Sequence, residues 1–212
     1  MMEAQRLSPT HYRLAEAHLE TIDPDWERLV KLVGPCTLQA HPAREPYEGL
    51  VRAVAYQQIH TRAGDAILAR LLALYPQTSF PAPRELLETD PAVLRACGFS
   101  WRKIETIRGI AEGALSGLVP ARHEAWEMRD EDLIARLVSL RGIGRWTVEM
   151  LLIYGLERTD ILPADDFGVR EGYRVLKNLE AAPSAREMAR IGQLLSPYRT
   201  VASWYLWRIP RS

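Results

Sequence analysis

The chain of 212 residues has little cysteine, no net charge and no long apolar run. Its two cysteines, Cys36 and Cys97, are too few for a disulfide scaffold, a zinc ribbon or a cysteine-ligated iron–sulfur cluster. No apolar stretch approaches the roughly 18 residues that a membrane span requires. The opening residues, MMEAQRLSPTHYRL, lack the apolar core of a signal peptide. We therefore expect a protein of the reducing cytoplasm.

The charge balance excludes a strongly basic tail, because 27 Lys and Arg side chains meet 27 Asp and Glu side chains. Basic side chains are nevertheless concentrated locally, since residues 186–212 contain five arginines and one glutamate. Such a segment can face phosphate groups or can be a solvated helix face, and charge alone leaves both readings open. The five histidines show no spacing typical of transition-metal ligands.

Apolar residues recur at helical spacing and no alternating strand pattern is visible, so the predicted class is all-α. Ser8-Pro9 and Asp23-Pro24 are typical of helix starts. Ser100 and Asp130 are predicted to cap two further helices. The helices are expected near residues 9–22, 24–33, 47–59, 61–75, 84–89, 91–96, 101–117, 131–140, 145–156, 166–177, 184–196 and 198–208.

A tight corner, Leu140-Arg141-Gly142-Ile143-Gly144, separates two of these predicted helices. Two glycines one residue apart permit a close hairpin and let a phosphate approach the backbone. The following helix would then present free N–H groups and a partial positive charge. No strand precedes Gly142-Ile143-Gly144-Arg145-Trp146-Thr147 and a third glycine is missing, so a dinucleotide fingerprint is excluded.

This corner and the Leu162-Pro163-Ala164-Asp165-Asp166-Phe167 segment that follows it form a composite motif. It resembles the helix-hairpin-helix and Gly/Pro-Asp loop (HhH-GPD) of the DNA glycosylase superfamily, in its 3-methyladenine DNA glycosylase II (AlkA/Mag-like) branch. Twenty residues separate Trp146 from Asp166, as in that family. The match covers about Pro46 to Trp207 and is strongest over residues 137–176.

The resemblance implies one glycosylase unit over residues 1–212, with two lobes and the active cleft between them. We expect residues 46–130 to form a central helical lobe with a minor-groove wedge. Residues 131–212 would hold the hairpin, the catalytic acid and C-terminal helices that pack with residues 1–45.

The family register makes Asp166 the catalytic carboxylate, which would stabilise an oxocarbenium-like sugar or orient the attacking water. Asp165 is expected to be the helix N-cap instead, a structural role worth about 1 kcal/mol. Trp146 stands where strand-cleaving relatives carry a Schiff-base lysine, so a monofunctional enzyme is implied. The resemblance also implies a base pocket lined by Trp146, Trp207, Phe167, Met150 and Tyr56. It gives no role to Trp204 and Tyr205.

The resemblance also implies which residues contact DNA. The Gln57-Gln58-Ile59-His60 junction matches the minor-groove wedge. The register favours Gln58 as the plug that replaces the flipped nucleotide, with Gln57 as the alternative and His60 as a groove contact. Gly142, Gly144, Arg145 and Thr147 are the expected hairpin contacts. The backbone carbonyls of Val138, Leu140 and Ile143 match a Na⁺ or K⁺ site, and no other cofactor is required.

The implied function is excision of alkylated bases, 3-methyladenine and also 7-methylguanine, from damaged double-stranded DNA by base flipping. The abasic site then enters base excision repair. A monomer is expected, in the cytoplasm or, in a bacterium, on the nucleoid. Three alternatives stay open: a glycosylase for etheno, deaminated, oxidised or mismatched bases, a non-catalytic DNA-damage-binding protein, and a helical scaffold. A scaffold would lack the steep salt dependence that phosphate contacts produce.

Overall fold

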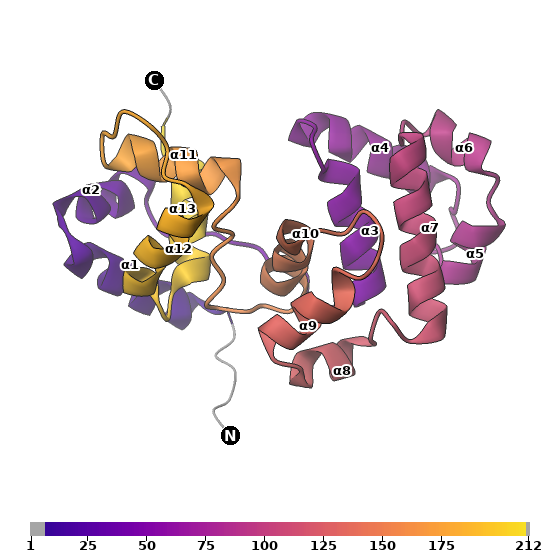
Figure 1. The fold of residues 1–212 in the computed structure, drawn as a ribbon, viewed down its shortest axis with the longest axis horizontal. Helices are drawn as coiled ribbons and strands as arrows, with labels where there is room; N and C mark the ends of the chain where they lie inside the picture. The colour runs from indigo at the N-terminus through magenta and orange to yellow at the C-terminus, as the bar shows by residue number, and fades with distance from the viewer. Residues whose placement is uncertain (1–6, 211–212) are drawn as a thin grey trace. The chain divides into compact units, whose positions relative to one another are not determined.

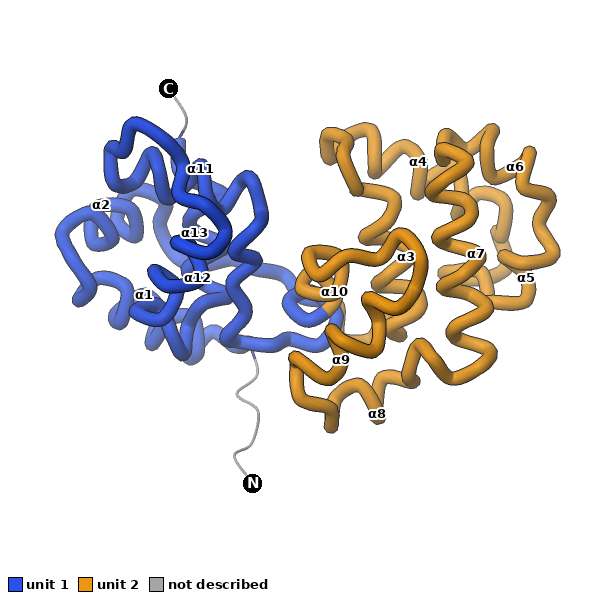
Figure 2. The backbone as a smooth tube through the Cα atoms, viewed as in Figure 1, with its two compact units in different colours: residues 1–40, 152–212 blue, residues 41–151 orange. Residues whose placement is uncertain are grey.

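The computed structural model describes residues 7–210, and within that range every regular element is a helix or helical turn (Figure 1). The all-α prediction is confirmed for these residues. Residues 1–6, the first part of the opening stretch without a signal-peptide core, lie outside the described residues. Of the described helices, none is both long and apolar enough to cross a lipid bilayer. The chain folds into two compact units, residues 1–40 with 152–212 and residues 41–151 (Figure 2).

Unit 1 combines both ends of the chain around one buried helix. Its elements are α1 (Pro9–Ile22), α2 (Pro24–Val33), α11 (Phe167–Leu176), α12 (Ala185–Ile191), a 3₁₀ turn (Gly192–Leu195) and α13 (Arg199–Arg208). Helix α13 packs on α1, α2 and α11, and its residues 200–206 are all buried. Ser8 and Asp23 cap α1 and α2 before a proline, as predicted. Trp204 and Tyr205 are core residues here, which agrees with giving them no functional role.

Unit 2 is built around the longest of the described helices, α7 (Trp101–Ser116). Ser100 caps it as predicted, and its buried isoleucines face α3 and α5. The other helices are α3 (Pro46–Tyr56), α4 (Thr61–Ala73), α5 (Pro83–Glu88), α6 (Pro91–Ala96), α8 (Arg122–Glu127), α9 (Asp130–Leu137) and α10 (Arg145–Met150). A π-helical turn, Leu151–Gly155, continues α10 across the boundary between the units.

Several predicted boundaries are wrong for identifiable reasons. Helix α3 ends at Tyr56 rather than at residue 59, because Gln58 has a left-handed backbone with φ of 55°. Asp130 lies inside α9, and Arg129 occupies the N-cap position without a side-chain cap. Helix α8 was not predicted, and neither was the π-helical turn, since one extra residue per turn leaves no clear mark on apolar spacing.

The division into units also differs from the predicted one. The N-terminal helices do join the C-terminal ones, but the hairpin between α9 and α10 belongs to unit 2. Helix α10 packs on α3 and α9, and Gly142 lies against Thr106 of α7. These contacts bind residues 131–151 to the central helices rather than to residues 1–45 and the C-terminal helices.

Candidate active site and nucleic-acid interface

Asp166 is held in a defined orientation at the start of α11 in unit 1. Its Oδ1 atom accepts the backbone N–H of Val169 at 2.8 Å and the indole Nε1–H of Trp207 at 2.8 Å. The residue is half-buried, so the carboxylate is fixed while part of it stays accessible. Asp166 is thus both the helix N-cap and the candidate catalytic group.

The expectation that Asp165 supplies the N-cap is wrong. Asp166 has the extended backbone of a cap and makes the capping hydrogen bond. The Asp165 side chain is 85% exposed, and its Oδ1 lies 3.9 Å from Arg170. An N-cap must bond an N–H two or three residues ahead, and only the second aspartate stands at that distance from the free N–H of Val169.

Aromatic rings lie beside this carboxylate. Trp207 and Tyr154 are nearly parallel, with ring centroids 6.4 Å apart and planes inclined by 18°. Gly168 makes room for the arrangement, since a Cβ there would lie 2.8 Å from Trp207 and 3.0 Å from Asp166. Phe167, an expected pocket residue, is 67% exposed on the same unit. The structure brings Trp207 and Asp166, two of the expected site residues, together.

Tyr154 and Gly168 were missed by sequence reasoning. Tyr154 sits in the π-helical turn, where the register differs from that of the α-helix assumed from apolar spacing. Burial raises the pKa of Tyr154, so the ring is a neutral phenol at ordinary pH. Gly168 was the one signal for this arrangement in the sequence. A glycine in the first turn of a helix indicates that another group packs closely against the backbone there.

A second carboxylate, Asp160, fixes the frame of the acid site. It accepts hydrogen bonds from Nε and Nη2 of Arg199 at 2.8 and 2.9 Å and from the Ser196 hydroxyl at 2.8 Å. Burial raises the pKa of Asp160, but the hydrogen bonds from Arg199 and Ser196 outweigh that effect and lower it. Arg199 begins α13, and Trp207 lies near the other end of this helix. The Asp160–Arg199 pair therefore anchors α13 to the loop that leads to Asp166.

In unit 2, the two hairpin glycines have different physical roles. Gly142 has a φ of 84°, and a Cβ there would lie 2.1 Å from Thr106 Oγ1, so only glycine fits. Around Gly144, by contrast, the described residues leave open space at the Cβ position. Gly144 is also the N-cap of α10, and it exposes the first turn of that helix to an approaching anion.

Two of the expected hairpin contacts form hydrogen bonds within the protein. Thr147 is only 2% exposed and its hydroxyl accepts a hydrogen bond from Gln57, so its side chain does not face outward. Arg145 is exposed but pairs with Glu131 through two nitrogens and with Glu149 at 2.9 Å. Hydrogen bonding to Glu131 and the charge of Glu149 raise the pKa of Arg145.

The turn between α3 and α4 presents three side chains outward. Gln58, Ile59 and His60 are exposed, and Gln58 has the left-handed backbone described above. Gln57 is half-buried and points to the hairpin, with its Nε2 2.9 Å from Thr147 Oγ1. We call residues 58–60 the wedge turn. Of the two candidate plugs, Gln58 is therefore the outward one.

The remaining expected pocket residues belong to unit 2. Trp146 and Met150 are half-buried on α10. The Tyr56 hydroxyl donates to Asp65 Oδ1 at 2.7 Å, and its ring fills the space next to Gly64. Tyr56 is thus engaged by α4 on one side.

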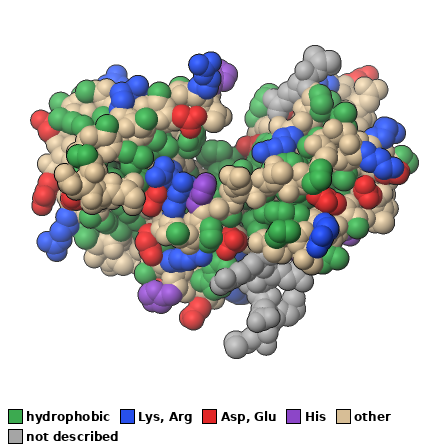
Figure 3. Space-filling view, turned by 180° about the vertical axis from the view of Figure 1, so that it is seen from behind, with side chains coloured by type: hydrophobic (Ala, Val, Ile, Leu, Met, Phe, Trp, Pro, Cys, Tyr) green, Lys and Arg blue, Asp and Glu red, His purple; other side chains and the backbone are tan. Residues whose placement is uncertain are grey.

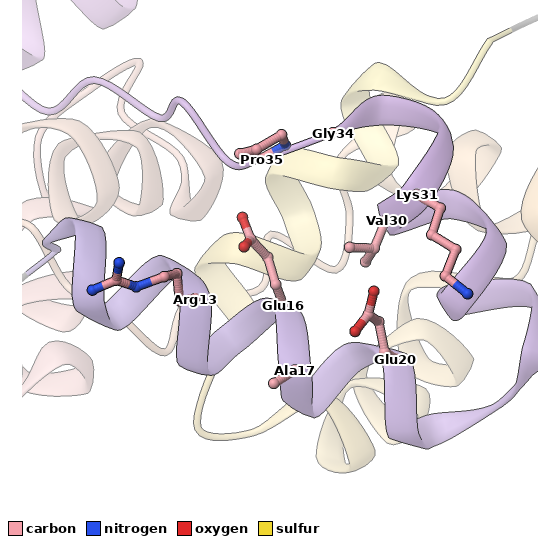
Figure 4. Close-up of a pocket in the computed structure, with 8 residues that line it drawn as sticks. All are labelled: Arg13, Glu16, Ala17, Glu20, Val30, Lys31, Gly34 and Pro35. Carbon is pink, nitrogen blue, oxygen red and sulfur yellow. The ribbon is translucent and has the colours of Figure 1, made fainter.

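A hollow of about 370 Å³ lies in unit 1 between α1 and α2 (Figure 4). Glu16 and Glu20 point toward Val30 and Pro35 there, and none of the lining side chains is aromatic. Glu16 Oε1 accepts the Cys36 N–H at 2.6 Å and the Tyr205 hydroxyl at 3.2 Å. These bonds give Glu16 a structural role. The side chains that line the hollow offer no aromatic surface on which a base could stack.

Charged side chains of both signs are mixed on the face of each unit that Figure 3 displays. Two arginines of residues 186–208 are engaged within the protein. Arg199 forms an ion pair with Asp160, and the Arg208 guanidinium lies 4.0 Å from the Trp204 ring centroid. The excess of arginine near the C-terminus is thus partly structural. Over residues 7–210, no group of His, Cys, Asp and Glu side chains is arranged to hold a metal ion.

Comparison with known proteins identifies the family. Residues 51–197 match the model of the HhH-GPD superfamily base excision DNA repair proteins. DNA-3-methyladenine glycosylase 1 of Schizosaccharomyces pombe is 47% identical over 92% of this chain and 86% of its own length. The alkylbase DNA glycosidase-like protein mag2 of the same yeast is 40% identical over 94% of each chain.

Solved structures agree with the sequence matches. The S. pombe 3-methyladenine DNA glycosylase in complex with abasic DNA superposes with a TM-score of 0.89 at 46% identity, covering 92% of this chain and 95% of that one. A DNA-3-methyladenine glycosidase from Bacillus halodurans gives a TM-score of 0.75 at 28% identity, covering 92% and 88% of the two chains. The resemblance inferred from the hairpin and the Asp loop is confirmed, and this chain belongs to the HhH-GPD superfamily of base excision DNA repair proteins.

Proposed function

We propose that this chain is a monofunctional DNA N-glycosylase that removes alkylated bases, 3-methyladenine and also 7-methylguanine, and leaves an abasic site. The observation that carries the proposal is the Asp166 carboxylate, oriented by Trp207 and adjacent to the parallel rings of Trp207 and Tyr154. The S. pombe relative named DNA-3-methyladenine glycosylase 1 supports the same substrate class.

The arrangement suits a cationic leaving group. Methylation at a ring nitrogen leaves the purine positively charged, and a cation against an aromatic face gains about 0.5–2 kcal/mol. When the glycosidic bond between the purine and C1′ breaks, the base takes both electrons and becomes neutral, so little help from a general acid is needed. The sugar becomes oxocarbenium-like, and the Asp166 carboxylate stabilises that charge. Water then adds to C1′, and its proton passes to Asp166 or to solvent.

The lysines of the chain support hydrolysis without strand cleavage. The sequence contains three lysines, Lys31, Lys103 and Lys177. Lys31 and Lys177 form ion pairs with carboxylates, and Lys103 donates to a backbone carbonyl. A Schiff-base mechanism needs a free amine at the reacting sugar. Trp146 stands at the hairpin position that would carry it, so the product is an intact strand with an abasic site.

DNA binding is assigned to unit 2. The open N-terminus of α10 at Gly144 would receive a phosphate, and the wedge turn would enter the minor groove. Gln58 would fill the space left by the flipped nucleotide, and its amide can hydrogen-bond the unpaired base opposite. His60 would contact the groove edges beside it.

A monovalent cation at the hairpin is part of the proposal. The carbonyls of Val138 and Ile143 accept no hydrogen bond from other described residues, while that of Leu140 accepts the Ile143 N–H at 3.1 Å. These carbonyl oxygens fit Na⁺ or K⁺, which would add positive charge beside a bound phosphate. We assign no other cofactor. We further propose that the enzyme acts as a monomer where cellular DNA is accessible, in the cytoplasm or nucleoid of a bacterium.

The decisive experiment compares two neighbouring variants, Asp166→Asn and Asp165→Asn. Asparagine is also a good N-cap, so Asp166→Asn keeps the helix start while removing the charge. On duplex DNA carrying 3-methyladenine or 7-methylguanine, we expect base release by the wild type and by Asp165→Asn. Strand breaks should appear only after alkali treatment. Asp166→Asn should lose activity by about 100-fold or more, the scale of losing one preorganised charge-stabilising group.

Other outcomes lead elsewhere. Unchanged excision by Asp166→Asn would remove this residue from the chemistry. Excision of etheno or deaminated bases but not of methylated ones would keep the reaction and change the substrate. Tight binding to an abasic analogue without release of any base would make the chain a damage-binding protein.

A further inference from the structure

Gln57 joins two DNA-binding elements that are far apart in the sequence. It follows α3 directly, and its Nε2 donates to the Thr147 hydroxyl at 2.9 Å and to the Gly142 carbonyl at 3.3 Å. Gly142 lies in the hairpin corner, and Thr147 lies in the first turn of α10. One side-chain amide thus connects the residue before the wedge turn with both parts of the hairpin, all within unit 2.

The geometry leaves Gln57 without a donor for DNA. A glutamine amide nitrogen carries two N–H groups, and two acceptors are placed here, so both donors are used. Thr147 is 2% exposed, which puts the main bond inside the protein. Gln58, the next residue, is exposed and has a left-handed backbone. The two adjacent glutamines therefore divide into an inward and an outward residue.

The wedge turn depends on such support. A non-glycine residue with positive φ is sparsely populated and persists only where its neighbours hold it. The N–H of Gln57 bonds Val54 O at 3.2 Å, and the N–H of Ile59 bonds Tyr56 O at 3.4 Å. Lys103 Nζ donates to Ala55 O at 2.9 Å and so supplies a hydrogen bond to a backbone carbonyl near the end of α3. These bonds hold the start of the turn, and the Gln57 side chain ties it to the hairpin corner.

We propose that Gln57 is a positioning residue that keeps the wedge turn in register with the hairpin. The hairpin would bind a phosphate, and Gln58 would replace the flipped nucleotide. The Gln57 amide holds these two elements at a fixed position relative to each other. Loss of the amide bond would leave phosphate binding intact and allow Gln58 to miss its place in the stack. This inference rests on the proposed function, and it assigns a role to a side chain that does not touch DNA.

The test uses isosteric variants on both sides of the bond. Gln57→Met keeps the length and removes the donor, and Thr147→Val keeps the shape and removes the acceptor. Thr147→Ser is the matched control, because it retains the hydroxyl while shortening the side chain. Each protein is first checked for an unchanged thermal unfolding midpoint. Binding is then measured on a duplex with a tetrahydrofuran abasic site, and base unstacking is followed by 2-aminopurine fluorescence next to that site. Single-turnover release of 7-methylguanine completes the set.

We expect Gln57→Met and Thr147→Val each to slow 7-methylguanine release and the unstacking step by about 10-fold, the scale of one lost hydrogen bond. The dissociation constant for abasic DNA should change by less than about 3-fold, since no DNA contact is removed. Thr147→Ser should behave as the wild type. The double variant Gln57→Met/Thr147→Val should be no slower than Gln57→Met alone, because Gln57→Met already removes the bond that Thr147→Val removes. Gln58→Met combined with Thr147→Val should be closer to additive.

Three results would overturn the proposal. Equal losses of affinity and rate in Gln57→Met would make Gln57 a direct DNA contact. Wild-type behaviour of Thr147→Val would show that the bond is dispensable. Additive losses in the double variant would separate the two residues. If the wild type released no methylated base, the proposed function would fail, while binding and 2-aminopurine signals on abasic DNA would still decide the role of Gln57.

Discussion

Trp207 donates its indole N–H to the same Asp166 oxygen that accepts the Val169 N–H, and each bond measures 2.8 Å. One donor comes from the end of α13 and the other from the first turn of α11. The carboxylate is therefore aimed by two elements before any substrate arrives. Such preorganisation avoids reorientation during the reaction, which is the main source of electrostatic stabilisation in enzymes.

The Trp207→Phe variant tests this bond. Phenylalanine keeps a ring beside Tyr154 but has no N–H to orient Asp166. A hydrogen bond to a charged group is worth about 1.5–3 kcal/mol, so base release should slow by about 10- to 100-fold. Trp204→Phe is the control, because the Trp204 Nε1 is buried without a partner among the described residues. Single-turnover assays should show a larger loss for Trp207→Phe, and equal rates in the two variants would remove the indole N–H from the mechanism.

The hairpin glycines offer a matched pair for separating folding from DNA binding. Gly142→Ala places a Cβ against Thr106 in a left-handed backbone, so the free energy of unfolding should fall by about 2 kcal/mol or more. Gly144→Ala meets open space at φ of −100° and changes only the N-cap of α10, so it should lower the free energy of unfolding by about 1 kcal/mol or less. Its added methyl group should instead weaken DNA binding. Urea unfolding and a DNA titration distinguish the two effects, and a stable Gly142→Ala protein would contradict the packing argument.

Glu131 is expected to restrain the hairpin arginine. It neutralises Arg145 through a two-point ion pair, and a phosphate would have to compete with it. Glu131→Gln should therefore tighten DNA binding. Because each neutralised phosphate adds close to one unit to the salt slope, the slope of log affinity against log salt should steepen by about one. Glu127→Gln on α8 makes the same change in net charge at another exposed site. Identical salt slopes in the two variants would show that Arg145 does not contact DNA.

His11 is expected to make the fold sensitive to mild acid. Burial lowers its pKa from the usual 6.5, and its Nε2 has no partner among the described residues. The unfolded chain therefore binds the proton first as the pH falls. The stability that neutral His11 contributes is present above pH 6.5 and is lost as the pH falls through the lowered pKa. Unfolding free energies at about pH 7.5 and 5 should differ more for the wild type than for His11→Phe. The exposed His123→Phe control should keep the wild-type difference, and an equal difference in His11→Phe would exclude His11 as its source.

Local signals in the sequence were sufficient for the fold class, the family and several helix starts. Ser8-Pro9, Asp23-Pro24 and Ser100 mark helix starts because capping involves residues only a few positions apart. The Gly142-Ile143-Gly144 corner and the aspartate 20 residues after Trp146 are likewise short-range patterns. They led to the family, and the family register led to the expectation that Asp166 rather than Asp165 is the catalytic carboxylate. The N-cap role was assigned wrongly to Asp165, because either of two adjacent aspartates can precede a helix and the sequence does not show at which one the helix begins.

Tertiary structure alone decided which side chains meet. Tyr154 joins Trp207 because a π-helical turn changes the register, and 53 residues separate the two rings in the chain. Gln57 reaches Thr147 across 90 positions and directs its amide toward the hairpin. Helix propensity and helix capping depend on residues that are close in the chain, so they can be predicted from the sequence. Which of two adjacent glutamines faces inward depends on helices packed from distant segments, and the chain carries no local record of that packing.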